Sequence, residues 1–180
     1  MARPNLSRAK VLDAAAELAA SGGVSATTVD DIAAAAGVAK GSVYYSFASK
    51  EQLFETLIEE SVTRLAERLG ESVAEALPGE GRPAARALAR AFLHAVEERP
   101  LRTKVVFAEL LRTDRPWSET LGGHRTTVLS RISDALRRDG SPASPLHASA
   151  FFGALVMVAF ERLVFEPGLT VEAAVDAVVG

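Results

Sequence analysis

The side chains best suited to direct chemistry gather in the short segment KGSVYYS at residues 40–46. Within seven residues this segment carries one ammonium, two phenols and two serine hydroxyls. Groups of these types bind phosphate oxygens and base edges in the major groove of DNA. The glycine among them, Gly41, lets the backbone approach a partner closely. The segment is therefore a candidate nucleic-acid contact surface.

Two short helices joined by a tight turn would position this segment. Thr28 is a good N-cap for the first helix, and Asp31 completes a capping-box-like pair with it. Gly37 ends that helix, because only glycine enters the left-handed conformation without steric cost. In the second helix, Val43 and Phe47 lie one turn apart on a buried face. The polar side chains then face outward, as in a helix-turn-helix.

The run TVDDIAAAAGVAKGSVYYSFASKEQLFETLIEE at residues 28–60 resembles the DNA-binding region of TetR-family transcriptional regulators. The resemblance rests on the threonine-led helix, its Ile-Ala pair and a set of fixed positions. These positions are Gly37, Val38, Gly41, Tyr44, Phe47 and the Lys-Glu-Gln-Leu stretch at 50–53. The matching motifs extend from about Ser7 to Glu60, and the remainder resembles the family only in length and helical character.

This resemblance implies an all-α protein with an N-terminal three-helix head. Residues 1–49 would form the helix-turn-helix DNA-binding domain, and residues 50–180 a helical effector-binding and dimerisation domain. The implied protein is a cytoplasmic homodimer and a ligand-responsive repressor, released from a palindromic double-stranded DNA operator by a small apolar molecule. The residues implied in DNA contact are Thr28, Lys40, Gly41, Ser42, Tyr44, Tyr45 and Lys50.

The expected role of each contact residue follows from its side chain. Thr28 and Lys50 are expected at phosphates, and Lys40 and Ser42 at base edges. The two tyrosines can give hydroxyls to phosphates and ring faces to thymine methyl groups. Two carboxylates at the start of the first motif helix, Asp30 and its neighbour, would repel phosphates unless they are turned away.

Composition and charge limit the class of protein. With 180 residues, 48% of them hydrophobic, the chain can fill the core of one domain, with or without a small second one. Residues 1–50 hold five Lys or Arg against four Asp or Glu in a chain of net charge −3, so the head is slightly basic on an acidic body. Cysteine is absent, which excludes disulfides and thiolate metal sites. We expect no membrane span, since the apolar run Phe151–Phe160 is short and the N-terminus has no signal region.

Helical periodicity and Pro or Gly breaks predict the remaining elements. Ser7 should cap the first helix, which runs to about Ala20. Further helices are predicted at about 50–77, 83–98, 101–113, 117–138, 144–165 and 171–179. The last of these leaves Gly180 at the end of an apolar helix, and the sequence does not tell whether a C-terminal tail follows it.

The segment Phe151–Phe160 is apolar nearly all round, and such a helix must be buried on both sides. The last helix alone is a modest cover, so burial predicts self-association, which the TetR resemblance also implies. A two-fold dimer would place two recognition helices roughly 34 Å apart on a palindromic site. Candidate interface residues are Leu155, Val158, Arg162, Val171, Val175 and Val178.

The body also holds side chains that suit an apolar effector cavity with a few polar groups. The candidates are Phe92, Phe107, Trp117, His124, Phe151 and Phe152. Ordinary core packing is the alternative role for each aromatic ring, and the cavity itself is implied mainly by the family resemblance.

Sequence patterns of enzymes are missing. The three histidines show no metal-binding spacing, and no Gly-x-Ser-x-Gly or P-loop spacing occurs. We therefore predict no enzyme activity, no metal and no cofactor. The alternative function is a helical ligand-binding or interaction module without sequence-specific DNA binding.

Overall fold

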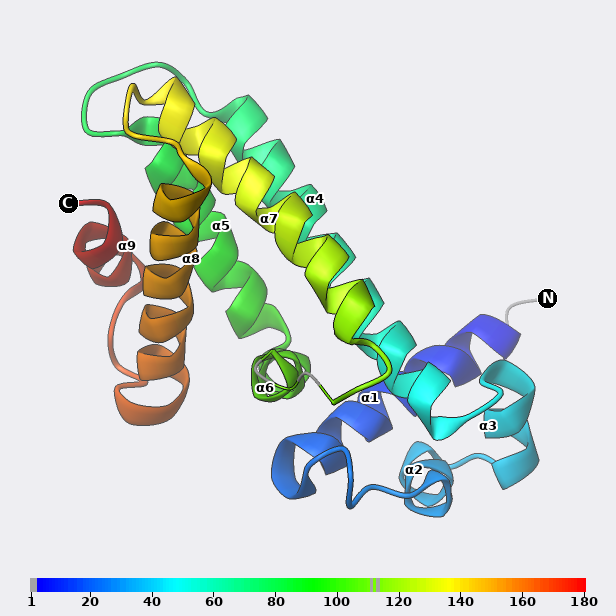
Figure 1. Cartoon of the computed structure of the whole chain (residues 1–180). Helices are drawn as coiled ribbons and strands as arrows, with labels where there is room; N and C mark the ends of the chain where they lie inside the picture. Colours follow the sequence, from blue (N-terminus) through cyan, green and yellow to red (C-terminus); the bar gives the residue numbers. More distant parts are fainter. Residues whose placement is uncertain (1–2, 111, 113) are drawn as a thin grey trace. The chain divides into compact units, whose positions relative to one another are not determined.

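The computed structural model describes residues 3–110, 112 and 114–180 (Figure 1). These residues form helices joined by turns, and no β-strand occurs among them, which confirms the predicted all-α fold. The helices are α1 (Arg3–Gly22), α2 (Val29–Ala36), α3 (Lys40–Ser46), α4 (Lys50–Glu75), α5 (Pro83–Glu98), α6 (Pro100–Glu109), α7 (Ser118–Arg138), α8 (Pro145–Phe160), the π-helical turn η1 (Glu161–Phe165) and α9 (Val171–Val179).

The chain divides into two compact units. One unit holds Met1–Ser61 and Leu101–Leu121, and the other holds Val62–Pro100 and Gly122–Gly180. Helices α4 and α7 each run from one unit into the other. The two units are defined by how the helices pack. The boundary predicted between residues 49 and 50 instead separates the DNA-binding residues from the effector-binding residues. That functional boundary stays a prediction.

In the first unit, helices α1–α3 pack on one another, and we call them the head. α1 buries Val11, Leu12 and Ala15 on the face that periodicity predicts. Ile32 of α2 and Val43 of α3 are also fully buried, at 0 and 1% exposure. Three short helices thus share one small apolar core.

The start of α1 differs from the prediction. The helix begins at Arg3, so Ser7 lies inside it rather than at its cap. Pro4 explains the early start, because proline is well suited to the first turn of a helix, where its missing N–H would have no intrahelical partner. Met1 and Ala2 lie outside the described residues.

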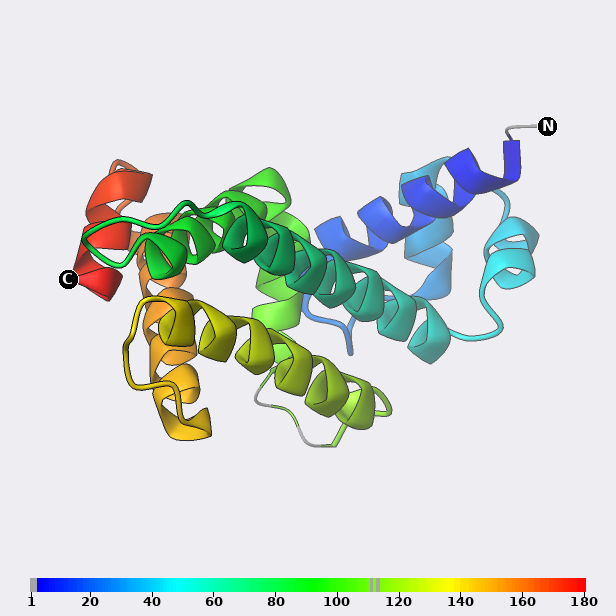
Figure 2. The ribbon, with the colours of Figure 1, turned by 90° about the horizontal axis from the view of Figure 1, so that it is seen from above.

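In the second unit, α5 packs against both α8 and α9. α5 buries Leu88, Ala89, Phe92 and Leu93, and Phe92 meets Phe152 of α8 edge to face, with ring centroids 6.1 Å apart. Figures 1 and 2 show α4 and α7 side by side in this unit. These helices build the apolar core of the second unit.

Three arginines at and within α5 attach α9. Arg82 is the N-cap of α5, and Arg86 and Arg90, four residues apart, share one face of the helix. Arg90 and Arg86 pair with Glu172 and Asp176, and Arg82 donates to the backbone carbonyl of Val179 at 2.6 Å. The C-terminal helix is therefore held by charge as well as by apolar burial.

The apolar helix near the C-terminus is longer than the run that drew attention in the sequence. α8 continues into η1, and together Pro145–Phe165 form one largely apolar stretch of 21 residues. This length and composition would suffice to cross a membrane, which corrects the prediction that the apolar run is too short. Such a helix is weak support for a membrane span, because the core helix of a globular protein has the same composition. Here α8 packs against α5 and α9.

Candidate functional site

The two helices of the motif are fixed by their caps. The Thr28 hydroxyl accepts a hydrogen bond from the Asp31 backbone N–H at 3.2 Å and donates to the Asp31 carboxylate at 2.6 Å. Gly37 ends α2 with φ of 65° and ψ of 36°, the left-handed conformation that glycine was predicted to supply. The Val38 N–H then bonds to the Ala33 carbonyl at 3.0 Å. The predicted cap and turn are confirmed.

Helix α3 presents a polar face and buries an apolar one. Val43 and Phe47 are 1 and 2% exposed, which anchors the helix to the head. The polar face is open: Tyr45 is 90% exposed and Tyr44 47%. Lys40, Gly41 and Ser42 are exposed as well. Five of the seven predicted contact residues therefore lie together on the surface of one short helix.

Nothing among the described residues requires glycine at position 41. A Cβ at this position would meet no atom within 4 Å, and Gly41 is not among the glycines with positive φ. Neither crowding nor backbone strain requires glycine there. Glycine at this position leaves the α3 backbone open to close approach by a partner.

Lys40 forms an ion pair with Asp30 of α2. The ammonium lies 2.8 Å from one carboxylate oxygen and 3.0 Å from the other. Both side chains stay largely in solvent, so the pair is screened and contributes little to stability. The hydrogen bond and charge of Asp30 raise the pKa of Lys40, which stays a cation. The carboxylates of Asp30 and Asp31 thus have partners within the motif.

The other two predicted contacts also have partners inside the head. Thr28 is exposed, but its hydroxyl serves the α2 cap. The Lys50 ammonium donates to the carbonyls of Val24, Ser25 and Thr27, at 3.2, 3.3 and 2.9 Å. Lys50 therefore holds the α1–α2 connection, a role for which the sequence around it gave no signal.

Arg8 of α1 likewise has partners within the head and α4. Its guanidinium lies 2.5 Å from the Glu60 carboxylate and stacks over the Phe47 ring, 5.3 Å from the centroid. The next basic residue, Lys10, is exposed and points to no partner among the described residues. Of these two basic residues, only Lys10 has no ion-pair partner among the described contacts.

The sequence of the head is similar to that of known DNA-binding regulators. Residues 11–57 match the family described as bacterial regulatory proteins, tetR family. The head thus matches the TetR family. The HTH-type transcriptional repressor KstR2 of Rhodococcus jostii is 43% identical over 70 residues, which cover 39% of this chain and 34% of that protein. The match to this curated relative thus spans about a third of its length.

Solved structures extend the similarity to the whole fold. A TetR-like transcriptional regulator from Rhodococcus sp. superposes with a TM-score of 0.78 at 25% identity, over 96% of this chain and 91% of that one. The regulator FadR of Bacillus subtilis, solved in complex with stearoyl-CoA, gives a TM-score of 0.79 at 18% identity and covers 95% of both chains. The helical body that follows the TetR head in the chain therefore has the fold of such regulators.

The predicted effector-cavity residues are not assembled into one site by the described contacts. Phe92 and Phe152 meet in the second unit, and Phe151 is buried at 8% exposure. His124 and Phe107 are half-buried. Trp117 belongs to the first unit, where it lies 6.4 Å from Phe54. The cavity therefore stays a prediction.

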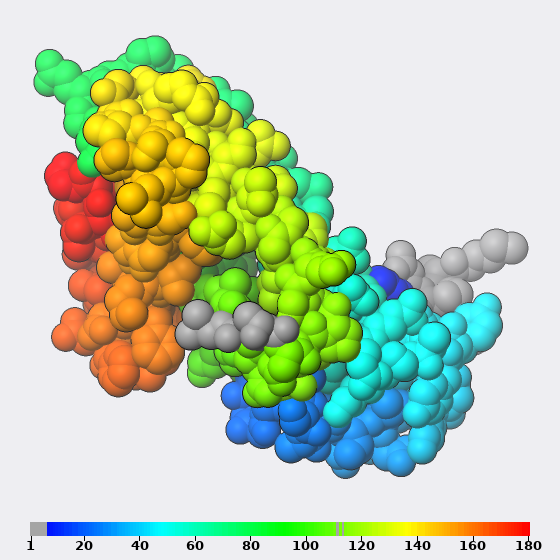
Figure 3. Space-filling view, in the orientation of Figure 1, coloured from blue at the N-terminus to red at the C-terminus, as the bar shows by residue number. Residues whose placement is uncertain are grey.

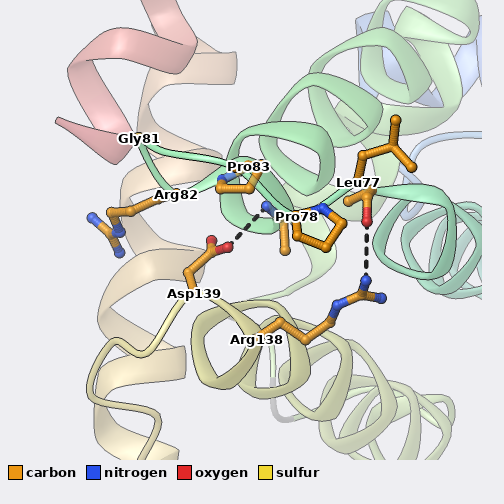
Figure 4. Close-up of a pocket in the computed structure, with 10 residues that line it drawn as sticks. Leu77, Pro78, Gly81, Arg82, Pro83, Arg138 and Asp139 are labelled. Carbon is orange, nitrogen blue, oxygen red and sulfur yellow. Dashed lines mark hydrogen bonds between the residues drawn. The ribbon is translucent and has the colours of Figure 1, made fainter.

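A cleft of about 330 Å³ does lie at the α4–α5 connection, between residues 76–84 and the end of α7 (Figure 4). Arg138 donates to the Val73 and Ala76 carbonyls at the end of α4. Asp139 accepts from the Ala84 and Ala85 N–H groups, at 3.1 and 2.8 Å, at the start of α5. Its polar groups thus satisfy helix ends, and none of the predicted effector residues lines it.

Two predicted interface residues are core residues instead. Leu155 and Val175 are both 0% exposed within a single chain, so they cannot reach a second copy. Val158, Arg162, Val171 and Val178 are half-buried, and Arg162 pairs with Glu97 of α5. The exposed apolar residues of α8 and η1, the segment drawn in orange in Figure 3, lie at other positions. They are Leu146, Ala150, Gly153, Met157, Phe160 and Val164.

Proposed function

We propose that this chain is a sequence-specific DNA-binding transcriptional regulator. The observation that carries the proposal is the open polar face of α3. Lys40, Ser42 and the two adjacent tyrosines project from a helix whose Val43 anchors it in a TetR head. Ammonium, hydroxyl and phenol groups on one exposed helix suit phosphates and base edges of the major groove. Thr28 and Lys50 then act by holding the motif in shape.

The proposed regulator is a homodimer that joins through the exposed stripe of α8 and η1. Leu146, Ala150, Gly153, Met157, Phe160 and Val164 follow one another at intervals of four and three residues. Alternating steps of four and three residues are the spacing of a helix seam that packs against a second helix. Small residues at the centre allow close approach, and large apolar side chains flank them. A second copy of the same chain would cover this surface.

We infer that the regulator is a repressor released by a small apolar effector. Its relative KstR2 is named a repressor, and the structurally similar FadR was solved with stearoyl-CoA. An effector that prefers the conformation unable to bind the operator must weaken DNA binding by the same coupling factor. Stearoyl-CoA, whose acyl chain supplies the apolar part, is therefore a reasonable first probe. We place the protein in the cytoplasm, with its operator, and assign it no catalytic role.

Selection of bound duplexes from a random DNA pool, at near-physiological salt, tests the proposal. We expect a palindromic sequence whose half-sites are about one helical turn apart, roughly 34 Å. Stearoyl-CoA and other long-chain acyl compounds would then be added to the purified complex in search of release. If folded, dimeric protein enriches no sequence, the alternative of a ligand-binding or interaction module without DNA binding is favoured.

A further inference from the structure

The ion pair between Asp30 and Lys40 joins the two helices of the motif. Asp30 is the second residue of α2 and Lys40 the first of α3, on either side of the turn at residues 37–39. The ammonium contacts both carboxylate oxygens, at 2.8 and 3.0 Å. Asp30 is 67% exposed and Lys40 55%, so burial does not force them together. An approaching DNA duplex would meet the pair rather than a free ammonium.

The Asp30 carboxylate affects charged and neutral acceptors of Lys40 differently. A phosphate oxygen that binds Lys40 comes close to the Asp30 carboxylate, and like charges repel. A guanine O6 or N7 is also a good acceptor for lysine but carries no net charge. An ammonium has three N–H donors, so it can keep its bond to Asp30 and still donate to a base edge. Asp30 therefore penalises phosphate contacts of Lys40 more than base contacts.

We propose that Asp30 is a specificity-determining residue, which keeps Lys40 off the phosphate backbone and reserves it for a base edge. This inference rests on the proposed DNA-binding function. Phosphate contacts supply most of the non-sequence-specific affinity of a DNA-binding protein. Asp30 therefore lowers affinity for random DNA while it preserves affinity for the operator.

Asp30 has a simpler structural role that must be separated from this one. A carboxylate in the first turn of a helix favours the helix dipole, and both Asp30 and Asp31 stand there. Asp31 is the matched control, because it is adjacent, exposed and equally charged. Its carboxylate bonds to the Thr28 hydroxyl and not to a lysine. Loss of either carboxylate changes the net charge of the protein and its interaction with the α2 helix dipole by the same amount. Only loss of the Asp30 carboxylate removes the ion-pair partner of Lys40.

The test uses the full chain with Asp30→Asn, Asp31→Asn, Lys40→Ala and the Asp30→Asn/Lys40→Ala double variant. Dissociation constants are measured between low and physiological salt for the duplex recovered by selection and for a shuffled duplex of equal length. We expect Asp30→Asn to bind the shuffled duplex about 3–10-fold more tightly, with a salt slope steeper by about 0.9 for each phosphate gained. The ratio of operator to shuffled affinity should fall by a similar factor.

The control variants decide the interpretation. Asp31→Asn should leave that ratio unchanged, and the effect of Asp30→Asn should vanish when Lys40 is alanine. Equal ratios in the two aspartate variants, or an Asp30→Asn effect that persists without Lys40, would overturn the inference. Wild-type protein that prefers no duplex would overturn the proposed function itself. Thermal unfolding of each variant establishes that the head remains folded.

Discussion

Arg102 of α6 donates two hydrogen bonds to one carboxylate oxygen of Asp13 in α1, at 2.7 and 3.1 Å. The arginine side chain is 7% exposed, while Asp13 is 65% exposed. The Arg102 guanidinium also lies 3.6 Å from the Glu60 carboxylate of α4. One buried charge thus connects three helices of the first compact unit.

The unequal burial of this pair predicts an asymmetry between its two partners. Asp13→Ala leaves a buried guanidinium short of an acceptor, and should lower the free energy of unfolding by about 1–2 kcal/mol. Arg102→Met should cost less, because water can solvate the exposed Asp13 and the methionine keeps the apolar stem. Urea denaturation of the two variants measures the difference. A larger loss for Arg102→Met would contradict the argument.

Lys50 should act on DNA binding only through the shape of the head. Its ammonium donates to the carbonyls of Val24, Ser25 and Thr27, so it is occupied within the chain. Lys50→Gln should therefore weaken operator binding by a similar factor at every salt concentration and lower the melting temperature. A direct phosphate contact, as predicted from the sequence, would instead reduce the salt slope by about 0.9 for each lysine removed. The slope of affinity against salt distinguishes the two roles.

Local signals in the sequence were enough for the helices and the caps of the motif. The Thr28 cap and the left-handed Gly37 each depend on residues within one turn of the chain. Partners of long side chains could not be predicted in this way. Arg8 finds Glu60, which lies 52 residues away, and Lys50 finds carbonyls 23–26 residues earlier. Such pairings depend on the tertiary arrangement.

The orientation of α8 shows a second limit. Because the helix is apolar nearly all round, its sequence has almost no preferred hydrophobic direction and cannot indicate which face is inside. Leu155 was therefore predicted at the interface, yet it is fully buried, whereas Met157 two residues on is 63% exposed. Only contacts with α5 and α9 decide between the two faces.

An introduced carboxylate should have different effects at positions 157 and 155. Met157→Asp places a carboxylate in the exposed stripe and should give folded monomers, since charge is disfavoured at the core of an interface. Leu155→Asp places one in the core of the chain and should unfold the protomer. Sedimentation gives the mass and far-ultraviolet circular dichroism the helix content. Dimers of Met157→Asp at micromolar concentration would place the interface elsewhere.

The attachment of α9 to α5 should weaken at acidic pH. Arg90 donates to both carboxylate oxygens of Glu172, at 2.7 and 2.8 Å. This hydrogen-bonded pair lowers the pKa of Glu172 below its usual value of about 4.3. A carboxylate with a depressed folded pKa stabilises the fold above its unfolded pKa, and that stabilisation is lost as the pH falls through the folded pKa.

Glu172→Gln removes this acid dependence. At neutral pH the wild-type protein should be the more stable of the two, and the difference should shrink once the pH falls below about 4.3. Urea midpoints at a series of pH values measure it. Glu80→Gln, in the exposed connection between α4 and α5, removes the same charge without an arginine partner among the described contacts and serves as the control. A wild-type advantage that stays constant from neutral to acidic pH would mean that packing, and not the Arg90–Glu172 pair, carries the effect.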